Sequence, residues 1–221
     1  ALYKFAKDGS MDELATVPML ADYSRGFKRC AVHQQTQRTY AIGDDEAGSH
    51  AVLLLDANLQ VVATVEATGD IPEDFDVAQD YEPIRDLAVH GDQVIVLTTE
   101  HHPKGSGLRL LDLDGRFLRT VAAGQLRNPY AVTASHGRAF VIDHGEDQDD
   151  YYDDDNDQGT GVNVLCVIDI QSGDIIQRVR VNLGGGSSAM IVDGDEIYIA
   201  GFGGDPGGPG VVVLQFAGSE A

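Results

Sequence analysis

Carboxylates alternate along one short stretch of the sequence. Asp153, Asp155, Asp157 and Gly159 form the pattern D-x-D-x-D-x-G. Alternating carboxylates with a following glycine let a short loop surround a Ca²⁺ ion with oxygen ligands. The match to an EF-hand loop is incomplete, because Gln158 stands where a glycine is expected and no glutamate stands at the twelfth position. Two interpretations stay open: a calcium site at these three aspartates, or a solvated acidic loop with no specific ligand.

Three histidines lie in or beside similar polar stretches, namely His101, His102 and His144. If these stretches converge in space, the imidazoles and nearby carboxylates could form a transition-metal site. No local ligand motif such as H-E-x-x-H is present, and loop histidines are more often ordinary surface residues. The sequence also contains no G-x-S-x-G nucleophile motif. Cys30 and Cys166 lie in apolar runs, and we expect both to be buried free thiols.

The composition limits the partners that the protein can have. The chain has 221 residues and a formal net charge of −21. Phosphates of nucleic acids and anionic membrane surfaces would repel such a chain. No apolar run approaches the roughly 20 residues that span a bilayer, so we expect no membrane insertion. The charge is typical of a solubilising surface, of cation binding, or of an extracellular or secreted setting.

The chain repeats itself. An apolar run that ends in aspartate, a turn and a second β-rich run occur together at 51–65, 107–121 and 163–181, with Asp56, Asp112 and Asp169 at matching places. A second pair of β-type runs joined by a short turn recurs at 28–43, 85–98, 130–143 and 188–201. Four-stranded antiparallel units at this spacing are typical of a β-propeller. A β-sandwich would not explain the repeat.

We therefore expect an all-β fold, a β-propeller of about four four-stranded antiparallel repeats, as one domain over 1–221. Its hairpins should lie near 1–17, 28–65, 85–121, 130–181 and 188–216. Eight acidic residues fall between Glu146 and Asp157. They belong to an insertion, 143–161, between the second and third strands of one repeat, where a loop tolerates added length.

One further pattern points to a known family. The stretch NPYAVTASHGRAFVID followed by VLCVIDIQSGDIIQRV resembles an NHL-type propeller repeat. That family shows a proline, an apolar strand, a glycine, an aromatic–Val–x–Asp strand and a later Asp–x–x–Gly. The resemblance covers most of 80–216 and is degenerate elsewhere; Thr98 stands where the aspartate would be in the preceding repeat. It implies the fold, while propellers as a class serve many functions.

Two arrangements of the ring stay open: the amino-terminal hairpin closes a small ring with the carboxyl-terminal strands, or the ring is open. The chain starts with a strand of the kind that comes third in each four-stranded repeat, LYKFA, and it ends with another strand of that kind, VVVLQF. A bare edge of an uncharged strand invites pairing. We therefore expect a terminal strand to pair with a protein partner, with a second copy, or with the rest of a longer parent protein. The favoured function is a non-enzymatic interaction or assembly module, with cation binding on its loop face as an open addition. The alternative is a metal-dependent propeller hydrolase or lyase acting on a small molecule.

The calcium hypothesis makes a thermal prediction. If Asp153, Asp155 and Asp157 bind Ca²⁺, calcium should raise the melting temperature, because a ligand that prefers the folded state stabilises it. The variant Asp155→Asn should abolish the rise, as followed by differential scanning fluorimetry. NaCl at matched ionic strength is the control. An equal rise with NaCl would mean charge screening instead of a specific site.

Overall fold

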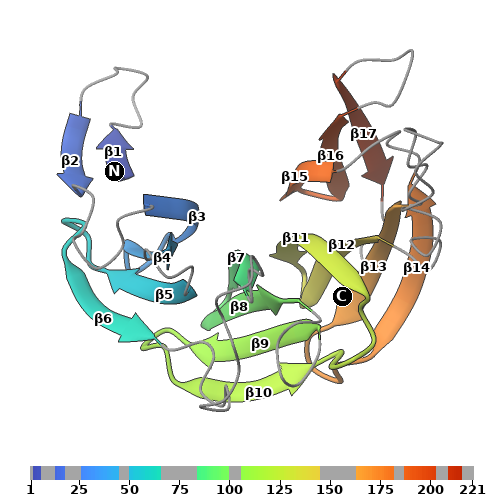
Figure 1. Cartoon of the computed structure of the whole chain (residues 1–221), viewed down its shortest axis with the longest axis horizontal. Coiled ribbons are helices and arrows are strands. Elements are labelled where there is room, and N and C mark those ends of the chain that lie inside the picture. The colour runs from blue at the N-terminus through green and yellow to red at the C-terminus, as the bar shows by residue number, and fades with distance from the viewer. Residues whose placement is uncertain are drawn as a thin grey trace, which may run out of the picture.

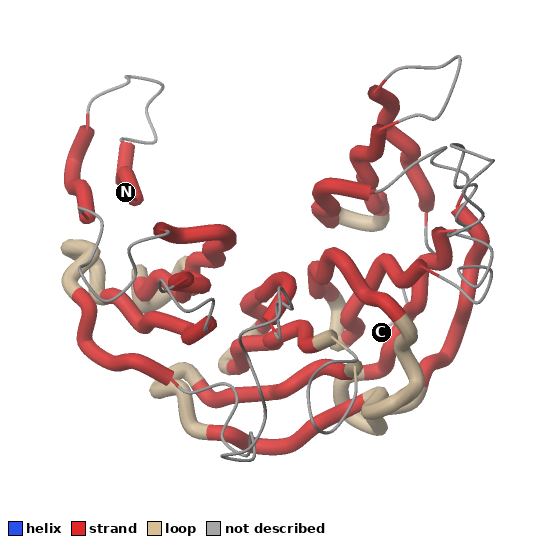
Figure 2. Tube along the Cα trace, viewed as in Figure 1, coloured by secondary structure: helices blue, strands red, loops and turns tan. Residues whose placement is uncertain are grey.

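The computed structural model describes residues 2–5, 13–17, 26–44, 50–65, 84–99, 106–144, 163–181, 187–202 and 209–215. Within these ranges every regular element is a strand (Figure 2). The strands form antiparallel sheets that follow one another around an arc (Figure 1). The all-β propeller arrangement expected from the repeats is therefore confirmed. Across these same ranges, no helix is long and apolar enough to cross a membrane.

Three of the sheets have four strands each, and each is built from strands consecutive in the sequence. Blade 1 contains β3 (Gly26–His33), β4 (Arg38–Asp44), β5 (His50–Leu55) and β6 (Val61–Val65). Blade 2 contains β7 (Ile84–His90), β8 (Gln93–Thr98), β9 (Gly107–Asp112) and β10 (Phe117–Val121). Blade 3 contains β11 (Asn128–Ser135), β12 (Arg138–His144), β13 (Asn163–Asp169) and β14 (Ile175–Val181).

The remaining two sheets are smaller and stand at the two ends of the arc. Blade 4 has three strands in the described chain, β15 (Ser187–Asp193), β16 (Glu196–Phe202) and β17 (Pro209–Gln215). The amino-terminal hairpin consists of β1 (Leu2–Phe5) and β2 (Glu13–Val17). The hairpin and blade 4 lie on opposite sides of the opening in the arc (Figure 1), and they belong to separate sheets.

The first strands of the four blades, β3, β7, β11 and β15, lie on the inner side of the arc (Figure 1) and share one irregularity. This irregularity shows which residues are equivalent from blade to blade. Each has a break in register near its start, where a β-bulge inserts a residue. The breaks fall between Phe27 and Arg29, Ile84 and Asp86, Pro129 and Ala131, and Ser187 and Ala189. Counted from these breaks, Arg29, Asp86, Ala131 and Ala189 occupy equivalent positions in the four blades.

The repeated aspartates close the turns between the third and fourth strands. Asp112 Oδ1 accepts hydrogen bonds from the backbone N–H groups of Asp114 at 2.9 Å and Arg116 at 2.8 Å, and Asp56 Oδ1 does the same for Asn58 and Gln60. Such bonds satisfy turn donors that would otherwise need water. The recurring aspartate in the sequence is therefore explained by turn structure.

Apolar side chains fill the space between neighbouring blades. One buried cluster joins blades 1 and 2 and includes Tyr40, Leu54 and Val94, while a second joins blades 2 and 3. A third cluster joins blades 3 and 4 through Phe140, Val167, Ile197 and Ile199. The apolar runs of the repeats predict that their central residues face a core, and four such residues are buried, namely Leu110, Val141, Val167 and Ile199.

This packing predicts the cost of a buried charge. Val141 is fully buried between blades 2 and 3. Val141→Asp should lower the free energy of unfolding by about 3 kcal/mol or more, because an unpaired carboxylate would be buried. Urea unfolding measures the change. The matched control is Val62→Asp at an exposed strand position, which should change stability little; equal losses in the two variants would contradict the described packing.

Candidate functional site: the axial cavity and the uncovered sheet face

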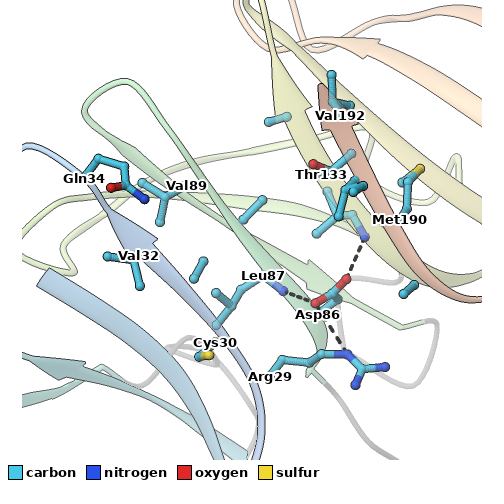
Figure 3. A pocket seen from close by; sticks show the side chains of 16 residues that line it. Arg29, Cys30, Val32, Gln34, Asp86, Leu87, Val89, Thr133, Met190 and Val192 are labelled. Carbon is cyan, nitrogen blue, oxygen red and sulfur yellow. Dashed lines mark hydrogen bonds and ion pairs between the residues drawn. The ribbon is translucent and has the colours of Figure 1, made fainter. Parts of the chain in front are cut away.

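The inner strands of the four blades surround a cavity on the concave side of the arc. Strands β3, β7, β11 and β15 line it, and its volume is about 640 Å³ (Figure 3). Most of the lining is apolar, with Leu87, Val89, Val132 and Met190 among the side chains. The charged residues of the lining are Arg29 and Asp86, which occupy equivalent positions in adjacent blades.

Asp86 connects three blades. One of its carboxylate oxygens accepts the N–H of Val132 in β11 at 2.9 Å, and the other accepts the N–H of Leu87 at 2.9 Å. The Nε atom of Arg29 in β3 lies 3.8 Å away (Figure 3). Burial raises the pKa of the Asp86 carboxyl, although the two backbone donors and Arg29 act in the opposite direction. The group is thus held in place by its bonds, and its role is to fix the positions of the inner strands.

A more deeply buried carboxylate, that of Asp143, lies in blade 3. Asp143 accepts the backbone N–H groups of Arg127 at 3.1 Å and Asn128 at 2.7 Å, and burial raises its pKa. The Arg178 guanidinium is 4.0 Å from Asp143 and donates to Cys166 Sγ at 3.3 Å. Burial raises the pKa of Cys166 to about 11. The thiol is therefore protonated at neutral pH, which is unfavourable for a nucleophile.

The two cysteines differ in a way that the sequence did not predict. Cys166 is a buried free thiol, as expected, whereas Cys30 is a free thiol that is exposed, so that prediction was wrong. Cys30 lies on β3, and its side chain is on the face turned away from blade 2. The equivalent residues Leu87, Val132 and Met190 are buried, because in blades 2 to 4 this face meets the blade before.

Blade 4 has one sheet face that is apolar and uncovered. The register places Ile191, Tyr198 and Val213 in one row across its three strands. Ile191 is 61% exposed and Val213 is 51% exposed; Val211, in the next row on this face, is 63% exposed. The opposite face packs on blade 3 through Met190, Ile197, Ile199, Val212 and Leu214.

The same row is covered in the other blades. Its equivalents are Ala31, Tyr40 and Leu54 in blade 1, Ala88, Ile95 and Leu110 in blade 2, and Thr133, Phe140 and Val167 in blade 3. Tyr40, Ile95, Leu110 and Phe140 are all fully buried against the blade that follows. The exposure of Ile191 and Val213 thus marks the place where a following sheet would pack.

The described structure does not test the metal ligands suggested by the sequence. Asp153, Asp155, Asp157, His101 and His102 lie outside the described residues. His144 ends β12, where its backbone pairs with Asn128 and Asn163. In the part of the chain that the structure describes, no three His, Cys, Asp or Glu side chains group closely enough to hold a metal ion. The calcium, transition-metal and enzyme hypotheses therefore stay predictions.

Asp86 and the row on blade 4 were not identified from the sequence. A signal for Asp86 exists in retrospect, since it places a charge at an inner-strand position where blades 3 and 4 have alanine. The row on blade 4 gave no such signal, because its residues resemble those of any core strand.

The chain matches no family model and no curated protein. Solved structures do resemble it. A structure described as TolB from Agrobacterium tumefaciens is 11% identical, with 97% of this chain and 69% of that one covered and a TM-score of 0.61. The acylaminoacyl peptidase of Pyrococcus horikoshii is 11% identical, with 86% of this chain and 31% of that one covered and a TM-score of 0.55. The computationally designed Ika4 protein is 11% identical, with coverage of 86% and 91% and a TM-score of 0.51.

These likenesses place the chain among β-propeller-type folds. At such low identity they show the fold alone. The chain also spans only about a third of the peptidase that it resembles. The resemblance to NHL repeats stays a likeness of motif, which no family model confirms.

The raised pKa of Asp86 makes a prediction about pH. Its folded-state pKa lies above that of the unfolded chain, so its contribution to stability is full below the unfolded pKa and is lost as the pH rises through the folded pKa. Relative to Asp86→Asn, which does not titrate, the wild type should gain stability as the pH is lowered through this window. Urea unfolding of both proteins at several pH values measures this. If the stability of the wild type relative to Asp86→Asn stays constant or falls as the pH is lowered, burial is not the main influence on the pKa of Asp86.

Proposed function

We propose that the chain is a non-enzymatic β-propeller module that binds protein partners through the uncovered face and outer edge of blade 4. The observation that carries this proposal is the exposure of Ile191 and Val213, whose equivalents in blades 1 to 3 are covered by the following sheet. The same apolar face is covered by the following sheet in each of blades 1 to 3, so on blade 4 it is a surface suited to binding a partner.

The outer edge of the same sheet supports the proposal. In blades 1 to 3 the third strand pairs with a fourth, whereas β17 pairs with β16 alone among the described strands. Its residues, Pro209–Gln215, carry no charge, like those of the outer strand β6, while the outer strands β10 and β14 carry arginines. Charged side chains discourage unwanted pairing at sheet edges, so β17 lacks this protection. An extended segment of a partner can add to such an edge through main-chain hydrogen bonds.

Strand addition can be tested with a peptide whose sequence already forms the outer strand of another blade in this chain. The peptide of residues 174–181 contains β14, which occupies the outer position beside β13 in blade 3. A labelled form of this peptide should bind the wild-type chain in fluorescence anisotropy. The variant Val213→Lys should weaken binding at least tenfold, because it places a charge in the contact surface.

Two controls make the result specific. A scrambled peptide of the same composition accounts for attraction between its arginines and the acidic chain. The control variant Ile176→Lys is made in the chain and not in the peptide. Ile176 is as exposed as Val213, at 51%, but lies on β14 of blade 3, so this variant should leave binding unchanged. Equal binding of the native and scrambled peptides, or equal losses in both variants, would overturn the proposed function.

A further inference from the structure

We propose that the axial cavity binds a small zwitterion of the α-amino acid class, with its ammonium group at Asp86, its carboxylate at Arg29 and a large apolar side chain against the inner strands. This inference goes beyond the proposed function and does not depend on it, because that function uses the uncovered face and outer edge of blade 4. It follows from the charges, main-chain groups and apolar surface that the cavity brings together.

The charges of the cavity sum to zero. Arg29 and Asp86 are the only charged side chains among the described residues that line it, and they stand at equivalent positions of β3 and β7. A ligand with a single charge would lie beside one like charge, whereas a ligand with one charge of each sign can match both residues. The net charge of −21 also repels anions at long range, but it exerts little net force on a zwitterion.

The separation of the two charges suits an α-amino acid. The Nε atom of Arg29 lies 3.8 Å from Oδ1 of Asp86, which is beyond hydrogen-bond distance (Figure 3). In an α-amino acid one carbon joins the ammonium nitrogen to the carboxylate carbon, so these two atoms are at most about 3 Å apart. Both groups can therefore reach the pair at the same time. A peptide would hold its terminal charges farther apart, because each added residue lengthens the chain by up to about 3.5 Å.

Both charged residues can bind a further group besides their contacts within the chain. The carboxylate of Asp86 has about four acceptor sites, and the N–H groups of Leu87 and Val132 occupy one on each oxygen. Burial raises the pKa of Asp86 in spite of these donors, so a positive ligand group beside it would stabilise its charged form. The side chain of Arg29 is 49% exposed, and a guanidinium has five N–H donors in a fork that fits a carboxylate.

Main-chain groups of the inner strands also face the cavity. Because Leu87 and Val132 donate to Asp86, their N–H groups point away from β8 and β12. Alternate residues of an antiparallel strand turn their main-chain groups to the same side, so those of Val89 and Ala134 point the same way. These four residues line the cavity, and β7 and β11 are end strands of their sheets. The cavity thus offers backbone donors to a polar ligand group in addition to the guanidinium.

The rest of the cavity suits an apolar side chain. Leu87, Val89 and Met190 are among the side chains that line it (Figure 3), and its volume of about 640 Å³ is in the range of small-molecule sites. None of the described lining residues is aromatic. A quaternary ammonium group, which aromatic rings bind best, is therefore less suited to the cavity than a primary ammonium group that donates hydrogen bonds to a carboxylate.

The test compares three probes that share one apolar body. L-phenylalanine carries both charges, 2-phenylethylamine carries only the ammonium group, and 3-phenylpropionate carries only the carboxylate. Isothermal titration calorimetry at neutral pH should show saturable binding of one L-phenylalanine per chain. The other two probes should bind at least tenfold more weakly, because each lacks one of the two charge-assisted contacts.

A matched pair of variants assigns the carboxylate contact. Arg29→Gln leaves Asp86 as the only charge of the described lining, so it should weaken L-phenylalanine binding at least tenfold without weakening the binding of 2-phenylethylamine. Lys28→Gln makes the same change in net charge at the neighbouring residue of β3, which is exposed and does not line the cavity, and it should leave all binding unchanged. Asp86→Asn is unsuitable as the deciding variant, because Asp86 also holds β11 through Val132.

The thiol of Cys30 reports where the probe binds, because it is exposed and lines the cavity, whereas Cys166 is buried. Saturating L-phenylalanine should slow the reaction of Cys30 with N-ethylmaleimide, as followed by peptide mass mapping. The proposal is overturned if L-phenylalanine shows no saturable binding, if the three probes bind equally, if both variants lose equal affinity, or if Cys30 is not protected. None of these outcomes bears on the binding of the peptide of residues 174–181, so the proposed function is judged separately.

Discussion

Every complete sheet of this chain is apolar on both faces, and the rest of the structure depends on that property. In blade 3, Val132, Val141 and Cys166 face blade 2, while Phe140 and Val167 face blade 4. A sheet of this kind is stable only if something packs on each side of it, at about 10 Å. Repetition solves the problem for each inner blade, because one blade covers the next. It does not cover the last described sheet of the arc, where Ile191, Val211 and Val213 of blade 4 are exposed.

Specific contacts add to the apolar packing and fix how adjacent blades lie. The Tyr40 hydroxyl donates to the Leu113 carbonyl at 2.7 Å, and His90 Nε2 accepts the Gly137 N–H at 3.0 Å. At the outer rim, Gly115 lies against Val65 of the preceding blade so closely that a Cβ would meet its methyl carbon at 2.2 Å. Gly115 also has a φ of +84°, so both its backbone and its lack of a side chain are required there. These contacts leave little freedom for the angle between blades.

The sequence could predict what depends on a single repeat. Alternating apolar residues, hairpin glycines and the turn residues Asp56, Asp112 and Asp169 are local features, and they identified the strands and their grouping. What depends on the neighbouring blade could not be predicted. Cys30 and Val132 occupy equivalent positions in similar strands, yet one is exposed and the other is buried, because only Val132 has a blade in front of it. The bonds of Asp86 to Val132 and its proximity to Arg29 likewise join residues far apart in the sequence.

The acidity of the chain bears on what would bind the uncovered face of blade 4. The net charge of −21 repels acidic surfaces at long range, so a partner of the face formed by Ile191, Tyr198 and Val213 would have to bury enough apolar area to offset that repulsion. A second sheet packed on this face would bury side chains across three strands at once, and pairing along β17 would add the main-chain hydrogen bonds that desolvated edges need. A misaligned contact would gain neither and would keep the repulsion, so the charge would favour partners that continue the blade-to-blade packing.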